Sequence, residues 1–232
     1  RAGAGPLPLV VVAEEQTAGR GRGANRWWTG RGSLAFSLVF DPAHWSLTSH
    51  PLPERSLAVG VAIVDTLRPH LPLGRVGLHW PNDVFVEGRK IAGVLIDVLS
   101  DNRHVVGIGI NVNNTLDGAP DEVRASATSL CELTGLSFDR TALLADLLGN
   151  LRIALHASSA SPEDLGRRFS ELCLQIGHEL TVDVAGRRTT GVCQGVAPDG
   201  ALLLDTPGGF QRFHSGVLRP AKAEGKRQKA EG

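Results

Sequence analysis

The chain has 232 residues, enough to bury a hydrophobic core as one large domain or as a main domain with a small appendage. Its 24 basic side chains balance 24 acidic ones, which gives no reason to expect a polyanionic partner such as DNA. The three cysteines lie far apart without metal-site spacing, so we expect neither disulfides nor a zinc site, and a reducing cytoplasm fits best. The apolar runs fall well short of the roughly 20 residues of a membrane helix, so no membrane partner is expected.

The first half of the chain predicts several strands and one helix. Leu7 to Ala13 is continuously apolar, which is typical of a buried strand, and large apolar residues alternate with mostly small ones from Ser33 to Phe40. Between Glu54 and about Arg68, apolar residues recur at helical spacing. Further strands are predicted at Val76 to Trp80, Val84 to Val86, Lys90 to Val98 and His104 to Val112.

The second half predicts two helices and then a change of pattern. A helix is expected from Asp139 to about Ala157, and Ser161-Pro162-Glu163-Asp164 has the cap, proline and acidic residues that begin another. From residue 174, short strands follow one another closely with turns between them, which is typical of a small β-barrel. We therefore expect a main domain over residues 1–173, a barrel over 174–220 and a disordered tail over 221–232.

A loop rich in glycine and arginine follows the first predicted strand. Glycines let backbone N–H groups converge on an anion, and Arg20, Arg22 and Arg26 add permanently charged guanidinium groups that match phosphate oxygens. A phosphate or nucleotide is the expected ligand, and a solvated loop with clustered arginines is the alternative. The spacing Gly19-x-Gly21-x-x-Ala24 also matches a dinucleotide-binding fingerprint, but no helix pattern follows it, and no acidic residue ends a second strand about 20 residues on.

A second group of polar residues surrounds a predicted hairpin. Pro81 ends one strand, so Asn82 and Asp83 turn outward, and Lys90 returns at the start of the next strand beyond the turn Glu87-Gly88-Arg89. The hairpin would present an amide, a carboxylate and an ammonium group together. The alternative is that Asn82 and Asp83 only form a turn and that Lys90 only protects a sheet edge.

Four motifs in order make the sequence resemble the biotin protein ligases. They are E-Q-T-A-G-R-G-R from Glu15, W-P-N-D from Trp80, R-K-I-A-G-V-L-I-D from Arg89 and G-I-G-I-N-V from Gly107. The resemblance covers Val10 to Pro220 and implies an α+β fold. In that fold, a mixed β-sheet with flanking helices forms the catalytic domain, and a small SH3-like barrel follows it. The catalytic domain would have the fold that lipoate ligases share and that is related to class II synthetases. It implies an enzyme that uses ATP with Mg²⁺ to convert biotin to biotinyl-5′-AMP and then biotinylates one lysine of a biotin carboxyl carrier domain.

The resemblance also implies roles for individual residues. Lys90 and Arg22 would be catalytic, because cations must neutralise a carboxylate that attacks a phosphate. Trp27 would cover the closed site, and Asp83 would bind Mg²⁺. The residues expected to contact biotin are Gln16, Thr17, Gly19, Arg20, Gly21, Arg22, Lys90 and Gly93. Those expected to contact ATP are Arg22, Trp27, Asn82, Asp83, Lys90 and Asn111.

Departures from the family pattern leave alternatives open. The family usually carries a Ser/Thr-rich segment that is missing before the first strand here, so a relic that binds ATP or the acceptor without turnover is one alternative. A lipoate or octanoate ligase of the same fold is another. No helix-turn-helix precedes the catalytic domain, so DNA binding is not expected, whereas a homodimer through exposed sheet edges stays open. His79 replaces the usual lysine and predicts that activity falls as pH rises past about 6.5.

Overall fold

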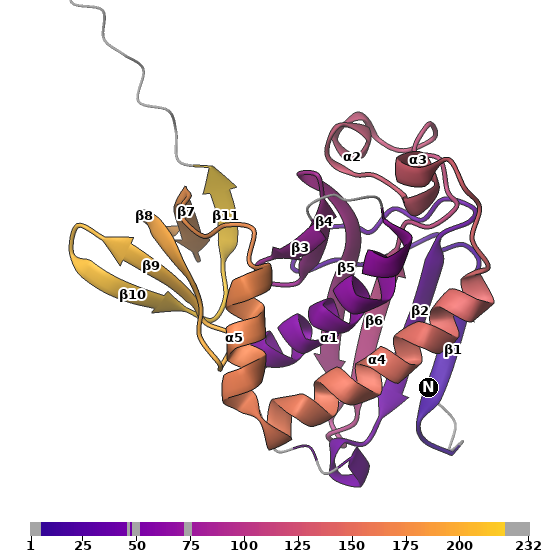
Figure 1. Cartoon of the computed structure of the whole chain (residues 1–232), viewed down its shortest axis with the longest axis horizontal. Coiled ribbons are helices and arrows are strands. Elements are labelled where there is room, and N and C mark those ends of the chain that lie inside the picture. Colours follow the sequence, from indigo (N-terminus) through magenta and orange to yellow (C-terminus); the bar gives the residue numbers. More distant parts are fainter. Residues whose placement is uncertain (1–5, 46, 48–51, 72–75, 221–232) are drawn as a thin grey trace, which may run out of the picture.

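The computed structural model describes residues 6–45, 47, 52–71 and 76–220, so the predicted tail over 221–232 lies outside the described residues. The predicted α+β class is confirmed: two sheets with separate strand orders are accompanied by helices (Figure 1). The ladders in both sheets are antiparallel. Parallel pairing in the described residues is confined to isolated bridges at Leu78–Cys173 and Lys90–Ala127.

The first sheet has six strands in the order β1-β2-β6-β5-β4-β3. Its strands are β1 (Leu9–Ala13), β2 (Leu34–Phe40), β3 (Val76–His79), β4 (Asp83–Val86), β5 (Arg89–Val98) and β6 (His104–Ile110). The central strands β2 and β6 are almost wholly buried, which agrees with their apolar sequences. All six strands were predicted from the sequence to within a few residues at each end. The expected burial of β1 is wrong, because β1 is an edge strand in which Val11 and Val12 are about half exposed.

Helices pack on one face of this sheet, as Figure 1 shows. Helix α1 (Leu52–Leu67) lies against β3, β4 and β5, α4 (Arg140–Ala160) packs on α1, and α5 (Pro162–Leu172) contacts both helices. Leu147, Leu151 and Leu155 of α4 are buried in the resulting core. The shorter elements are η1 (Pro42–Trp45), η2 (Arg68–His70), α2 (Asp121–Ser126) and α3 (Leu130–Thr134). The core therefore fixes the sheet and the start of α4 relative to each other.

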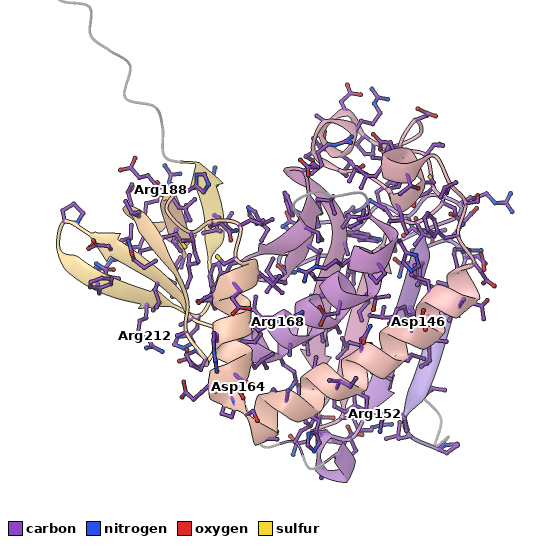
Figure 2. All side chains as sticks on the ribbon, viewed as in Figure 1. Asp146, Arg152, Asp164, Arg168, Arg188 and Arg212 are labelled. Carbon is purple, nitrogen blue, oxygen red and sulfur yellow. The ribbon has the colours of Figure 1, made fainter. Side chains whose placement is uncertain are left out.

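The C-terminal sheet has five short strands in the order β10-β9-β8-β7-β11. They are β7 (Glu179–Val184), β8 (Arg187–Val196), β9 (Leu202–Thr206), β10 (Gly209–Phe213) and β11 (Val217–Pro220). The predicted series of close strands is confirmed, but the described edge strands β10 and β11 do not pair with each other, so the sheet is not closed by a ladder. Figure 2 shows Arg188 and Arg212 on this sheet.

Buried hydrogen bonds join the two sheets. The Trp80 indole Nε1 donates to the Gly200 carbonyl at 2.9 Å, and the Trp80 backbone N–H donates to Gln175 Oε1 at 3.3 Å. Gly200 lies so close to the backbone of Glu54 that an added Cβ would be 2.5 Å from the Glu54 nitrogen. These contacts hold the C-terminal sheet beside β3, next to the W-P-N-D motif. No helix in the described ranges is both long and apolar enough to cross a bilayer.

Candidate active site

A cavity of about 830 Å³ lies between the glycine-rich loop, the first sheet and the C-terminal sheet. The loop after β1 forms one wall, and β2, β3, β4, β5 and β6 form the floor. Segments 183–185 and 215–218 of the C-terminal sheet form the remaining wall. Among the predicted site residues, those that line the cavity are Gln16, Arg20, Gly21, Arg22, Trp27, Asn82, Asp83, Lys90 and Gly93.

The glycine-rich loop is folded back as a small hairpin. Gly21 N–H donates to the Asn25 carbonyl at 2.9 Å, and Trp27 N–H donates to the Gly19 carbonyl at 3.1 Å. A Cβ on Gly19 would lie 2.3 Å from the Trp27 carbonyl oxygen, so only glycine allows this close approach. The hairpin presents arginine side chains toward the cavity from a backbone that has its own hydrogen bonds.

Arg22 is the half-buried cation of this hairpin. Its Nη2 donates to the carbonyl of Gly216 in the C-terminal sheet at 3.5 Å, the long limit of a hydrogen bond. Burial lowers the pKa of Arg22 and the charge of Asp83 acts in the opposite direction, yet a guanidinium stays protonated at neutral pH. Its weak protein contact leaves this charge available to an anionic ligand in the cavity.

Lys90 faces the same cavity from the start of β5. Its Nζ lies 2.7 Å from Asp83 Oδ2, and the side chains of Lys90 and Asp83 are 31% and 20% exposed. The turn that joins their strands has Glu87 and Gly88 at φ +50° and +76°, which is typical of a two-residue type I′ hairpin. The second Asp83 oxygen, Oδ1, is buried without a hydrogen-bond partner in the described residues. The predicted grouping of Lys90 with Asp83 is therefore confirmed.

The Trp27 side chain lies inside the cavity against the sheet. A Cβ on Gly109 would be 2.4 Å from Trp27 Cε2, and a Cβ on Gly93 would be 3.2 Å from Trp27 Cζ3. These two glycines are paired across β5 and β6. Lys90 Nζ lies 5.5 Å from the centroid of the indole ring, within cation–π range. The indole therefore lies on Gly93, which we expect to contact biotin, and the predicted role of Trp27 as a cover of the closed site stays a prediction.

Two other predicted residues bond within the protein, and Thr17 does not line the cavity. The Gly19 carbonyl bonds within the loop hairpin. Asn111 is buried: its Nδ2 donates to the Thr128 carbonyl at 3.0 Å, and its Oδ1 accepts from Asn114 Nδ2 at 3.2 Å. Its predicted contact with a nucleotide stays a prediction, and in this structure its carboxamide holds segment 111–128 together.

Sequence reasoning missed the wall contributed by the C-terminal sheet. Asp183, Val184, Ala185 and the segment 215–218 line the cavity, although they follow the glycine-rich loop by about 160 residues or more. Turns between the short C-terminal strands were predicted, but not that two of these segments would lie beside the glycine-rich loop. A contact of this kind depends on how the two sheets pack, and no local pattern encodes it.

His79 lies at the end of β3, on the cavity wall, and its ring stacks on Phe85 with centroids 4.4 Å apart. Burial is the largest cause that lowers its pKa below the ordinary 6.5; Asp83 acts in the opposite direction, and Lys90 also lowers it. Burial therefore favours the neutral imidazole, which argues against the predicted fall in activity as pH rises past about 6.5.

We expect His79 to cause no change in kcat/KM between pH 7 and 8. Steady-state kinetics across that pH range measure this. The free energy of unfolding should fall as pH drops below about 6.5, because the unfolded histidine binds a proton that the buried one resists. His79→Gln should reduce that fall, which urea titrations at pH 5.5 and 7.5 would measure. A drop in kcat/KM centred near pH 6.5 that His79→Gln abolishes would contradict this assignment.

The arrangement is suited to joining two anions. Lys90 from β5 and Arg22 from the loop hairpin place two positive charges on the lining of one cavity, and Asp83 fixes the ammonium group. Such charges stabilise the negative charge that develops when a carboxylate attacks a phosphate. The described residues contain no group of three or more His, Cys, Asp or Glu side chains that would hold a metal ion.

Comparisons with known proteins point to the same chemistry. Residues 5–113 match the model of the biotin/lipoate A/B protein ligase family. The chain is 34% identical over 209 residues to a biotin--[acetyl-CoA-carboxylase] ligase of Mycobacterium tuberculosis, which covers 86% of this chain and 74% of that protein. It is also 28% identical over 222 residues to the bifunctional ligase/repressor BirA of Bacillus spizizenii. This match covers 90% of the present chain, which spans 65% of the length of that relative.

A solved structure agrees in fold as well as in sequence. The biotin protein ligase from Aquifex aeolicus in complex with biotin and ATP matches with a TM-score of 0.80 and 30% identity, and the match covers 91% of this chain and 89% of that one. The four motifs meet at one cavity in a fold that this ligase shares. By its sequence and its fold, the chain belongs to the biotin protein ligase family.

Proposed function

We propose that this chain is an ATP-dependent biotin protein ligase that adenylates biotin and transfers the biotinyl group to a lysine of a biotin carboxyl carrier domain. The observation that carries the proposal is the position of Lys90, whose Nζ lies in the cavity 2.7 Å from Asp83, opposite the arginine hairpin. The relative from Mycobacterium tuberculosis is named for this activity, and the Aquifex aeolicus ligase binds biotin and ATP.

In the first step, a carboxylate oxygen of biotin attacks the α-phosphorus of ATP and pyrophosphate leaves. Both reactants are anions, so the step needs cations that are already in place. Lys90 would bridge the carboxylate and the α-phosphate, and Arg22 would leave its long contact with the Gly216 carbonyl to bind the phosphate from the loop side. Because the guanidinium is half-buried, this interaction is less screened by water than a surface ion pair.

In the second step, a neutral lysine amine of the acceptor attacks the biotinyl carbonyl and AMP leaves. The mixed anhydride also reacts with water, so the loop must keep water out until the acceptor arrives. The hairpin from Gly19 to Trp27 and the segment 215–218 border the cavity from two sides and are suited to this task.

Magnesium would enter as part of the ATP complex. Asp83 Oδ1 is buried without a partner in the described residues and could bind that ion, which would take most of its other oxygen ligands from phosphate and water.

We also propose that the C-terminal sheet corresponds to a small SH3-like barrel over residues 174–220 and that the enzyme works in the cytoplasm. Homodimerisation is proposed through a sheet edge, where β1 exposes Val11 and Val12.

A mass-spectrometric assay tests the proposed activity. The chain is incubated with MgATP, biotin and an acceptor carrier domain, and we expect the mass of one biotinyl group on one lysine. A parallel reaction with lipoic acid tests the lipoate ligase alternative, because the matched family model includes both activities. Lipoyl transfer without biotinyl transfer would overturn the proposal, and binding of ATP without either product would favour the inactive relic.

Biotin binding should change the fluorescence of Trp27. The indole lies on Gly93 and Gly109, where the ligand ring is proposed to bind, so a ligand in this place has to displace it. We expect a saturable change in tryptophan emission during a biotin titration, and Trp27→Phe should remove most of it. Trp28→Phe is a matched control next in the chain, since Trp28 packs on Gly30 instead. If Trp27→Phe keeps the full change in emission, the ligand does not displace Trp27.

A further inference from the structure

The β1–β2 ladder, which pairs Ala13 with Ala35, closes the functional loop at its base, and one side chain from a distant helix fixes this base to the rest of the molecule. Residues 14–33 leave the first sheet after β1 and return to it at β2. Arg140, the first residue of α4, donates from Nη1 to the Ser33 carbonyl at 2.8 Å and from Nη2 to Glu14 Oε2 at 2.9 Å. A single planar guanidinium therefore bonds to both ends of the loop, at the residue after β1 and the residue before β2.

The helix that carries Arg140 is itself fixed. Its N-cap Asp139 accepts from the backbone N–H groups of Thr141 and Ala142 at 2.8 and 3.2 Å. The preceding Phe138 exchanges two hydrogen bonds with the side chain of Asn113, at 2.8 and 2.9 Å, and Asn113 N–H donates to the Gly32 carbonyl at 3.0 Å. The start of α4, the end of the G-I-G-I-N-V strand and the base of the loop thus form one connected unit.

Helix stability does not explain the arginine. The N-terminus of a helix carries partial positive charge, where a basic side chain is unfavourable, and the first turn of α4 holds no acidic residue. Asp139 already supplies the cap, and the buried leucines on α4 supply the packing. Arg140 is partly exposed, with 29% of its side chain accessible, so it does not fill the core either. What its two bonds do is hold the ends of the loop together.

The contacts at the tip of the loop are weaker than those at its base. Arg22 reaches Gly216 at 3.5 Å, and Arg20 lies 3.9 Å from Asp97 with both side chains at least half exposed. Exposed pairs of this kind contribute little. At the base, the Glu14 carboxylate is also exposed, so the bond from Arg140 to the carbonyl of the buried Ser33 supplies most of the restraint on where the tip can reach.

We propose that Arg140 is a positioning residue that closes the base of the loop and sets the place at which Arg22 and Trp27 meet the cavity. This inference rests on the proposed function for its kinetic consequences only. Because Arg140 bonds to the loop ends and does not line the cavity, it should favour substrate and transition state equally. Its loss should then raise KM and leave kcat nearly unchanged.

Limited proteolysis with trypsin tests the loop directly, without any substrate. The loop holds cleavage sites after Arg20, Arg22, Arg26 and Arg31, and fragments that begin after them are identified by mass spectrometry. In Arg140→Ala we expect cleavage there to be about tenfold faster, the effect of losing one charge-assisted hydrogen bond, with an unchanged Tm. Arg152→Ala is the matched control, because Arg152 is an exposed arginine on the same helix (Figure 2).

Steady-state kinetics complete the test. We expect Arg140→Ala to raise KM for biotin about tenfold while kcat stays within about threefold of wild type. Arg140→Lys should recover part of the loss, since one ammonium group can bond to one end of the loop, and Glu14→Gln should give a smaller effect of the same kind.

Wild-type cleavage rates and KM in Arg140→Ala would overturn the proposal. So would a lower Tm with faster cleavage throughout the chain, which marks a merely structural role. A third outcome separates the two claims. If neither the wild type nor any variant transfers biotin but Arg140→Ala is still cleaved faster in the loop, the proposed ligase activity is rejected and the positioning role of Arg140 is kept.

Discussion

Replacing Lys90 with alanine should slow the adenylation of biotin by about 2 to 4 kcal/mol of activation free energy, or roughly 30-fold to 1,000-fold. The reason is geometric: Nζ lies in the cavity, fixed by Asp83 at 2.7 Å, so it is in place before the reaction and needs no reorganisation. The measurement is biotin-dependent exchange of pyrophosphate into ATP. Exchange within threefold of wild type would remove Lys90 from the mechanism.

Two controls separate catalysis from folding in this experiment. Lys90→Ala leaves the Asp83 carboxylate without its ion pair, so Tm has to be measured alongside exchange, and Lys90→Met keeps the side-chain volume without the charge. Arg89→Ala is a neighbouring cation whose ion pair points to Glu132 at 2.6 Å and away from the cavity lining. We expect Lys90→Met to be as slow as Lys90→Ala, whereas Arg89→Ala should keep exchange near wild type.

Much of the first sheet could be predicted because its signals are local. A continuous apolar run marks β1, alternation of large apolar with mostly small residues marks β2, and the positive φ angles of Glu87 and Gly88 agree with the tight turn predicted there. The same turn brings Lys90 back beside Asp83, so this part of the site followed from the sequence. The short helices α2 and α3 were not predicted, because five or six residues are too few to establish a helical period.

What the sequence could not predict depends on contacts between distant segments. The position of Trp27 on Gly93 and Gly109 requires the loop hairpin to fold onto β5 and β6, and neither the tryptophan nor the glycines specify this alone. The third wall, at 183–185 and 215–218, exists because buried bonds such as Trp80 to Gly200 hold the C-terminal sheet beside β3. Burial likewise reversed the expectation for His79, whose pKa is lowered by an environment that the motif does not reveal.

Replacing Arg22 with glycine should make the enzyme release biotinyl-5′-AMP before transfer. Arg22 is the half-buried cation of the hairpin, and within the described residues its hydrogen bond to the protein is the long one to the Gly216 carbonyl, so its charge can serve a phosphate instead. Removing it loses a charge-assisted hydrogen bond to the intermediate, about 1.5 to 3 kcal/mol, and glycine also makes the hairpin harder to order. Adenylation should fall less than in Lys90→Ala, because Lys90 still bridges the reacting groups.

Gel filtration after a single turnover measures this release as the fraction of intermediate that stays with the protein. Arg22→Ala separates the loss of charge from the added flexibility of glycine, and Arg26→Gly is a matched control in the same hairpin, on the strand that returns from its tip. If charge dominates, Arg22→Ala and Arg22→Gly should both lose the intermediate and Arg26→Gly should retain most of it. If all three retain it as wild type does, the phosphate is held by groups other than Arg22, and the arginine hairpin would then act as a cover rather than as a ligand-binding clamp.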